Sequence, residues 1–100
     1  GKNYFKDIEI LKGRIKKRKK KESKKFRSQF GHTPLSTLEN IPWDAKKLII
    51  GTGHSSALPV MEEVKKKAKK KGVELVLMST PDAILNINAK DTNFILHLTC

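Results

Sequence analysis

The chain has 100 residues, which suits one domain and is too short for two. Lys and Arg number 22 against 10 Asp and Glu, a net charge of +12, and the 37% of hydrophobic residues suffice for one core because they cluster in the second half. No apolar run reaches the roughly 18 residues of a membrane span, and no secretory signal pattern is present, so we expect neither membrane insertion nor secretion.

Cysteine usage indicates a reducing compartment. Cys100 is the single cysteine and cannot form an internal disulfide, so we expect a cytoplasmic protein. No CxxC pair or ligand cluster accompanies this thiol. We therefore interpret Cys100 as a small apolar residue at the end of a strand rather than as a reactive or metal-binding group.

The N-terminal third predicts a basic β region over residues 4–30. Tyr4 to Leu11 alternates apolar and charged residues, as in a half-buried strand. Lys12-Gly13 is a tight-turn signal, so a hairpin return through Lys19 follows. A third strand is predicted over Lys24–Gln29, where Phe26 supplies an apolar contact, with disorder of this like-charged block as the alternative.

Charge concentrates in two clusters, and the first supports two interpretations. Ten positive charges fall between Arg14 and Arg27, and a surface of this kind attracts polyanions such as nucleic acid. Lys far outnumbers Arg and few aromatics interleave, which favours a solvated face that serves solubility or thermal stability. The residues of the alternative polyanion patch are Arg14, Lys16, Lys17, Arg18, Lys19, Lys20 and Lys21. The second cluster is Lys65–Lys67 with Lys69–Lys71.

The middle of the chain predicts one short helix. Ser36-Thr37-Leu38-Glu39 has the capping-box form, in which the serine accepts a backbone N–H and the glutamate reaches back. Pro42 ends this helix after one or two turns.

Residues 46–100 predict a βαβαβ core. Leu48–Ile50 forms a buried strand, Pro59–Lys71 a helix with Gly72 at its left-handed cap, and Val73–Met78 a strand covered on both faces. The second helix is expected to start with Thr80 as N-cap and Pro81 at its first position. Its inner face is predicted to comprise Ala83, Ile84 and Ile87, and Phe94–Thr99 closes the sheet.

This order of elements predicts an α/β fold in a single domain over residues 1–100. Strands separated by helices pair in parallel through right-handed crossovers. The sheet is therefore mixed and mostly parallel, flanked by helices, with the N-terminal hairpin as an extra layer or an edge.

One loop has a composition suited to ligand binding. Gly51-Thr52-Gly53-His54-Ser55-Ser56 follows a parallel strand, where glycines allow close backbone approach and a helix start presents N–H groups to an anion. The loop lacks the third glycine of a dinucleotide fingerprint and the GK[ST] of a phosphate loop, so we favour a simple βα connection. The carboxyl ends of the strands are the expected place for any ligand.

No catalytic or metal-binding constellation is evident. His32, His54 and His97 have no spacing typical of a metal site, and no serine lies in a GxSxG context. We expect neither an enzymatic activity nor a cofactor.

Three segments together resemble the Mth-type domain of unknown function. They are Leu48–Gly53, Thr80-x-x-Ala83-Ile84-x-x-x-Asn88 and His97–Cys100. The family includes the adipogenesis-associated Mth domain-containing protein and an assembly factor of mitochondrial respiratory complex I. The resemblance implies one mixed sheet flanked by helices with an extra β layer, no settled enzymatic activity, and motif residues at Thr80, Ala83 and Asn88.

The leading functional hypothesis is a non-enzymatic interaction or assembly module with a protein partner. Two alternatives stay open, a nucleic-acid-binding protein that uses the Arg14–Arg27 segment and a small-ligand or anion-binding domain that uses Gly51–Ser56. The sequence assigns no self-association.

Overall fold

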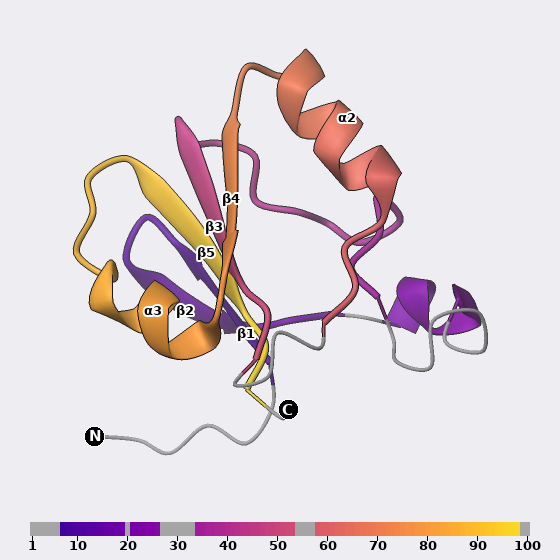
Figure 1. Ribbon diagram of the computed structural model, residues 1–100, viewed down its shortest axis with the longest axis horizontal. Helices are drawn as coiled ribbons and strands as arrows, with labels where there is room; N and C mark the ends of the chain where they lie inside the picture. Colours follow the sequence, from indigo (N-terminus) through magenta and orange to yellow (C-terminus); the bar gives the residue numbers. More distant parts are fainter. Residues whose placement is uncertain (1–6, 20, 27–33, 54–57, 99–100) are drawn as a thin grey trace.

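The computed structural model describes residues 7–19, 21–26, 34–53 and 58–98. These residues form a five-stranded mixed sheet in the order β2-β1-β5-β3-β4. The predicted α/β class is confirmed, and the N-terminal hairpin extends the edge of this same sheet. Helix α2 covers one face of the sheet and α3 the other (Figure 1).

The hairpin joins β1 (Ile8–Leu11) to β2 (Arg14–Lys17). The two turn residues both have positive φ, 50° at Lys12 and 83° at Gly13. Positive φ at both positions matches the right-handed twist of an antiparallel pair, so the two-residue turn fixes the register. Strand β1 also pairs antiparallel with β5, which attaches the hairpin to the core.

The core has the predicted alternation of strands and helices. It runs through β3 (Lys47–Gly51), α2 (Glu62–Lys70), β4 (Glu74–Met78), α3 (Thr80–Leu85) and β5 (Thr92–Leu96). Both β4 and β5 pair in parallel with β3, one on each side. The chain therefore reverses its direction of winding between β3 and β5, and the carboxyl ends of these two strands lie at a topological switch point.

Two apolar clusters hold the layers together. On the α2 face, Leu48 and Ile50 of β3 pack with Val64 of α2 and Ile95 of β5. On the α3 face the cluster is Ile8, Ile10, Ile49, Ala83, Phe94 and Leu96. Gly72 has φ +70°, which confirms its predicted place after α2.

Two predictions for the first half of the chain are wrong. Residues Lys21–Phe26 form a 3₁₀ helix, η1, where a strand was expected to begin at Lys24. Ser36–Glu39 forms a turn rather than a helix, with Glu39 N–H bonded to the Ser36 carbonyl at 3.2 Å. The Glu39 carboxylate does not cap this turn because it binds Arg18 and Ser23 instead.

Three details of the second half also differ from prediction. Strand β4 is an edge strand rather than one covered on both faces, and Leu77 is 41% exposed. Helix α3 is capped by Ser79, whose hydroxyl accepts the Asp82 N–H, because the Thr80 hydroxyl is used within the core. Of the predicted inner face of α3 only Ala83 is buried. Ile84 lies within the helix but is 48% exposed, and Ile87 lies beyond the end of the helix.

Candidate functional site

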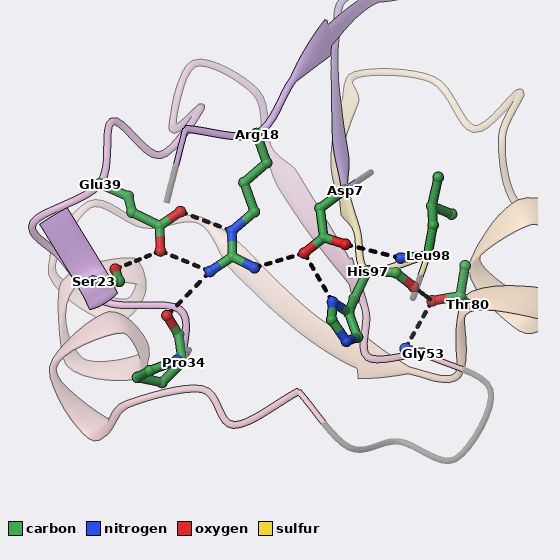
Figure 2. Close-up of polar contacts among 9 residues, drawn as sticks. All are labelled: Asp7, Arg18, Ser23, Pro34, Glu39, Gly53, Thr80, His97 and Leu98. Carbon is green, nitrogen blue, oxygen red and sulfur yellow. Dashed lines mark hydrogen bonds and ion pairs between the residues drawn. The ribbon is translucent and has the colours of Figure 1, made fainter. Parts of the chain in front are cut away.

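A buried ion network lies beside the carboxyl end of the sheet. The Arg18 guanidinium donates to both Glu39 carboxylate oxygens at 2.8 Å, to Asp7 Oδ2 at 2.8 Å and to the Pro34 carbonyl at 3.0 Å (Figure 2). Its side chain is completely buried. Burial alone would lower the pKa of Arg18, but the bonds to Glu39 and Asp7 outweigh it and raise that pKa. Arg18 is therefore a fixed structural cation.

The network ties together segments that are distant in sequence. Ser23 of η1 donates its hydroxyl proton to Glu39 and accepts a hydrogen bond from the Ser36 hydroxyl. Ser23 and Ser36 are both buried. Arg18 thus holds the end of β2 against the turn at residues 34–39, and Glu39 in turn holds helix η1 through Ser23. Losing any of these partners would leave a buried charge unpaired, which is costly.

Asp7 links this network to the last strand. Its Oδ2 lies 2.8 Å from His97 Nδ1, and its Oδ1 accepts the Leu98 N–H at 3.1 Å. Burial would raise the pKa of Asp7, but the bonds from His97 and Leu98 and the charges of His97 and Arg18 lower it to about 2. Asp7 is consequently a carboxylate at neutral pH and accepts the proton on His97 Nδ1.

The second ring nitrogen of His97, Nε2, has a different environment. His97 Nε2 is buried and has no hydrogen-bond partner among the described residues. With the proton held on Nδ1 by Asp7, a neutral ring presents a lone pair at Nε2. An aspartate that orients a histidine in this way also supports histidines that bind metals or move protons. No group of three or more metal-ligating side chains occurs in the described ranges, however.

Three segments meet at the switch point: the glycines of the predicted ligand loop, Thr80 at the start of α3, and His97 after β5. Gly53 N–H donates to Thr80 Oγ1 at 2.8 Å, and that hydroxyl donates to the His97 carbonyl at 2.7 Å. A Cβ on Gly51 would lie 2.9 Å from Thr80 Oγ1, so this strand end requires glycine. Gly53 has φ +97°.

Only half of the predicted anion loop lies within the described residues. Gly51, Thr52 and Gly53 are buried and bonded to neighbouring strands, as a structural connection would be. His54, Ser55 and Ser56 lie outside the described residues. Of the family-motif residues, Thr80 belongs to this convergence and Ala83 packs from α3 onto the sheet. Asn88 lies at the opposite end of the sheet, in the lining of a cavity.

Arg18, at the centre of the predicted polyanion patch, is buried and is not part of the surface. Arg18 faces inward, and Lys20 lies outside the described residues. The remaining members, Arg14, Lys16, Lys17, Lys19 and Lys21, are exposed. Strand β2 is exposed on both of its faces, which makes this a charged sheet edge.

The opposite edge has a different surface. Glu74 N–H bonds to the Lys46 carbonyl at 2.9 Å, and the Met78 carbonyl accepts the Thr52 N–H at 2.8 Å. Because alternate residues of a parallel strand bond to alternate sides, the peptide groups of Leu75 and Leu77 point away from β3. Among the described strands β4 has no second neighbour, so these groups form an open hydrogen-bonding edge.

A shallow groove of about 350 Å³ runs between this edge and α2. Its apolar part comprises Leu75, Leu77, Val73 and Ala68, and its cationic part comprises Lys65 and Lys69. Leu75 and Leu77 pair in register with Leu48 and Ile50 of the α2-side core, so their side chains lie on the α2 face. The edge therefore combines open backbone groups, apolar side chains and positive charge.

Sequence reasoning missed both features for identifiable reasons. Arg18 stands in a run of cations that all look alike, and nothing local marks it as the buried one. The carboxylates that bury it, Asp7 and Glu39, are 11 and 21 residues away. The composition of β4 is that of a buried strand, and only the strand order shows it to be an edge.

Comparison with solved structures finds a chain of similar fold. The chain is similar to the crystal structure of a conserved hypothetical protein from Pyrococcus horikoshii, with a TM-score of 0.82 and 28% sequence identity over 100% of this chain and 88% of that one. No family model matches the chain, and no curated protein matches it. No helix in the described part of the chain is long and apolar enough to cross a membrane.

Proposed function

We propose that this protein is a non-enzymatic interaction module that binds an extended, acidic segment of a partner protein along β4. The single observation that carries the proposal is the open edge of β4, with an apolar groove and two lysines beside it. Strand addition is a common mode of peptide recognition, in which backbone bonds give affinity and neighbouring pockets give specificity.

The occupant follows from the chemistry of the edge. The peptide groups of Leu75 and Leu77 require a backbone in extended conformation. The groove on the α2 face takes apolar side chains from every second residue of the added strand. Lys65 and Lys69 lie four residues apart on α2 and line the same groove, so acidic residues complement it.

Two other occupants are less compatible with these charges. A second copy of this chain, paired antiparallel along β4, would bring two lysine-rich α2 helices next to each other on one face of the joined sheet. Each copy carries a net charge of +12, so the two copies would repel each other across this interface. Nucleic acid would satisfy the lysines but would leave the apolar groove and the outward peptide groups without partners.

Membership of the Mth-type family and a cytoplasmic location are part of this proposal. The convergence of Gly51, Thr80 and His97 supports the family, because one residue of each resembling segment meets there. The single cysteine supports a reducing compartment.

Selection from a random peptide display library tests the binding mode. We expect enriched peptides to carry apolar and acidic residues together at every second position, the positions that face α2. They should lose binding to a Leu77→Pro variant, which lacks one outward N–H. The matched Leu77→Val variant keeps that N–H and should retain affinity. Enriched peptides that bind Leu77→Pro as well as the parent chain would contradict strand addition.

Two lysine pairs on the same helix test the charge requirement. Lys65→Gln with Lys69→Gln should weaken a selected acidic peptide about 3- to 10-fold, the effect of two exposed ion pairs. Lys66→Gln with Lys70→Gln changes the net charge equally but lies outside the groove, so it should have a smaller effect. Fluorescence anisotropy measures both. Equal losses would show that general attraction, rather than the groove, provides the affinity.

A further inference from the structure

A second cavity lies at the amino-terminal end of β5, away from the β4 edge. It measures about 410 Å³, within the size range of small-molecule sites. Ile10 and Phe94 form its floor, Ile87 and Asn88 its wall, and Lys12 and Asp91 part of its rim.

The cavity exists because α3 is too short to cover its face of the sheet. Six helical residues extend about 9 Å, whereas the five residues of β5 extend about 16 Å. Helix α3 therefore covers one half of this face, at Ala83, and leaves the other half open beneath the segment that follows the helix. Ile87, in that segment, is still 36% exposed.

The rim holds two residues in an uncommon backbone conformation. Lys12 and Asp91 both have φ of 50°, and they are the positive-φ residues other than glycine in the described ranges. Buried Asn93 fixes the first of them, since its Oδ1 accepts the Lys12 N–H at 2.9 Å. The Asp91 carbonyl accepts the Lys47 N–H at 3.3 Å. Both rim positions are thus held by the sheet.

The charges at the rim do not cancel. Lys12 Nζ lies 3.5 Å from Asp44 Oδ2, so this cation has a carboxylate beside it. The Asp91 carboxylate makes no hydrogen bond or ion pair with any described residue. A carboxylate without an ion pair among the described residues therefore borders an apolar floor. Asp91 also lines a neighbouring cavity with Lys46 and Lys71, and neither lysine makes an ion pair with it.

We propose that this cavity binds a small molecule that joins an apolar ring or chain to an ammonium or similar N–H donor. The apolar part packs on Ile10, Phe94 and Ile87, and the donor faces Asp91. This site is independent of the β4 edge, so each proposal can fail without the other.

Three probes with the same ring separate this site from general attraction. Benzylamine, benzyl alcohol and benzoate share a phenyl ring and carry a positive, zero and negative charge at neutral pH, and NMR of the Ile10 and Ile87 methyl groups reports occupancy. We expect benzylamine to bind about three- to fivefold more tightly than benzyl alcohol, as for one exposed ion pair, and benzoate to bind most weakly. The net charge of the whole protein predicts the opposite order.

Asp91→Asn is the decisive variant, because asparagine tolerates positive φ and removes only the charge. It should bring benzylamine down to the affinity of benzyl alcohol. Asp82→Asn removes the same charge from the exposed face of α3 and should leave the preference unchanged. The proposal is overturned if no probe shifts these methyl groups, if the three bind equally or benzoate binds best, or if the preference for benzylamine survives Asp91→Asn.

Discussion

The two edges of the sheet differ in almost every property that governs association. Strand β2 has the sequence Arg-Ile-Lys-Lys and is exposed on both faces, and charged lysines on an edge discourage the addition of another strand. Strand β4 presents Leu75 and Leu77 beside a groove, with outward peptide groups and, among the described strands, no neighbour besides β3. An added strand is therefore disfavoured at β2 and favoured at β4, and this contrast is the basis of the proposed function.

The largest expected effect concerns the anchor of the charged edge. Arg18→Met leaves Asp7 and Glu39 buried without their cation, so we expect a loss of about 3–5 kcal/mol in the free energy of unfolding. Lys19→Met, at the exposed neighbouring position, should change it by less than about 0.5 kcal/mol. Urea denaturation measures both. Similar small losses in the two variants would mean that Arg18 is not the structural cation of this edge.

Proline substitutions distinguish the inward and outward sides of β4. Val76→Pro removes an N–H directed at β3 and leaves a buried carbonyl without its donor, at a cost of about 2–3 kcal/mol. Leu77→Pro removes an outward N–H, so it should cost markedly less. Thermal and urea unfolding provide the comparison. The assignment of the open edge is wrong if Leu77→Pro is the more damaging of the two.

Acid titration tests the link between Asp7 and the rest of the network. Folding lowers the pKa of Asp7 from 3.8 to about 2, so its contribution is present above the unfolded pKa and disappears as pH falls through the folded value. We expect a loss of about 2 kcal/mol between about pH 5 and pH 2.

Glu9 contributes with the opposite sign, because burial and the charge of Glu39 raise its pKa. The comparison with Asp7→Asn therefore isolates the Asp7 contribution. An equally steep acid dependence in that variant would show that another group is responsible.

The smallest effect is expected at the exposed cations of β2. Lys16→Gln with Lys19→Gln should leave stability unchanged and should only reduce the salt-dependent, weak binding of single-stranded RNA. Submicromolar RNA binding at about 0.15 M salt that these two substitutions abolish would make the charged edge a nucleic-acid site instead.

The sequence predicts the framework of this molecule better than its surfaces. Hairpin, parallel core and the Gly72 cap follow from patterns within a few residues of each other, and all three are confirmed. The 3₁₀ helix η1 could not be predicted, because Ser23 is drawn inward by Glu39 from 16 residues away. The Thr80 hydroxyl is likewise committed to His97 and Gly53, so the adjacent Ser79 becomes the cap.

The candidate sites were harder to predict because they depend on strand order. The apolar run of β4 is compatible with a central strand and with an edge strand alike. The cavity near Asp91 depends on how far α3 extends over β5. The amino-acid composition of this segment does not show at which residue the helix ends. The sequence of Gly51–Gly53 favours a βα connection, but the contacts with Thr80 and His97 that hold it come from residues at least 27 positions away.

Backbone amide hydrogen exchange, recorded by NMR with and without a saturating acidic strand-forming peptide, tests the central claim most directly. The account predicts that exchange slows at the amides of Leu75 and Leu77, which gain partners on the open edge, and stays unchanged along β2 from Arg14 to Lys17. Slower exchange along β2, or no change at Leu75 and Leu77 when the peptide is bound, would contradict it.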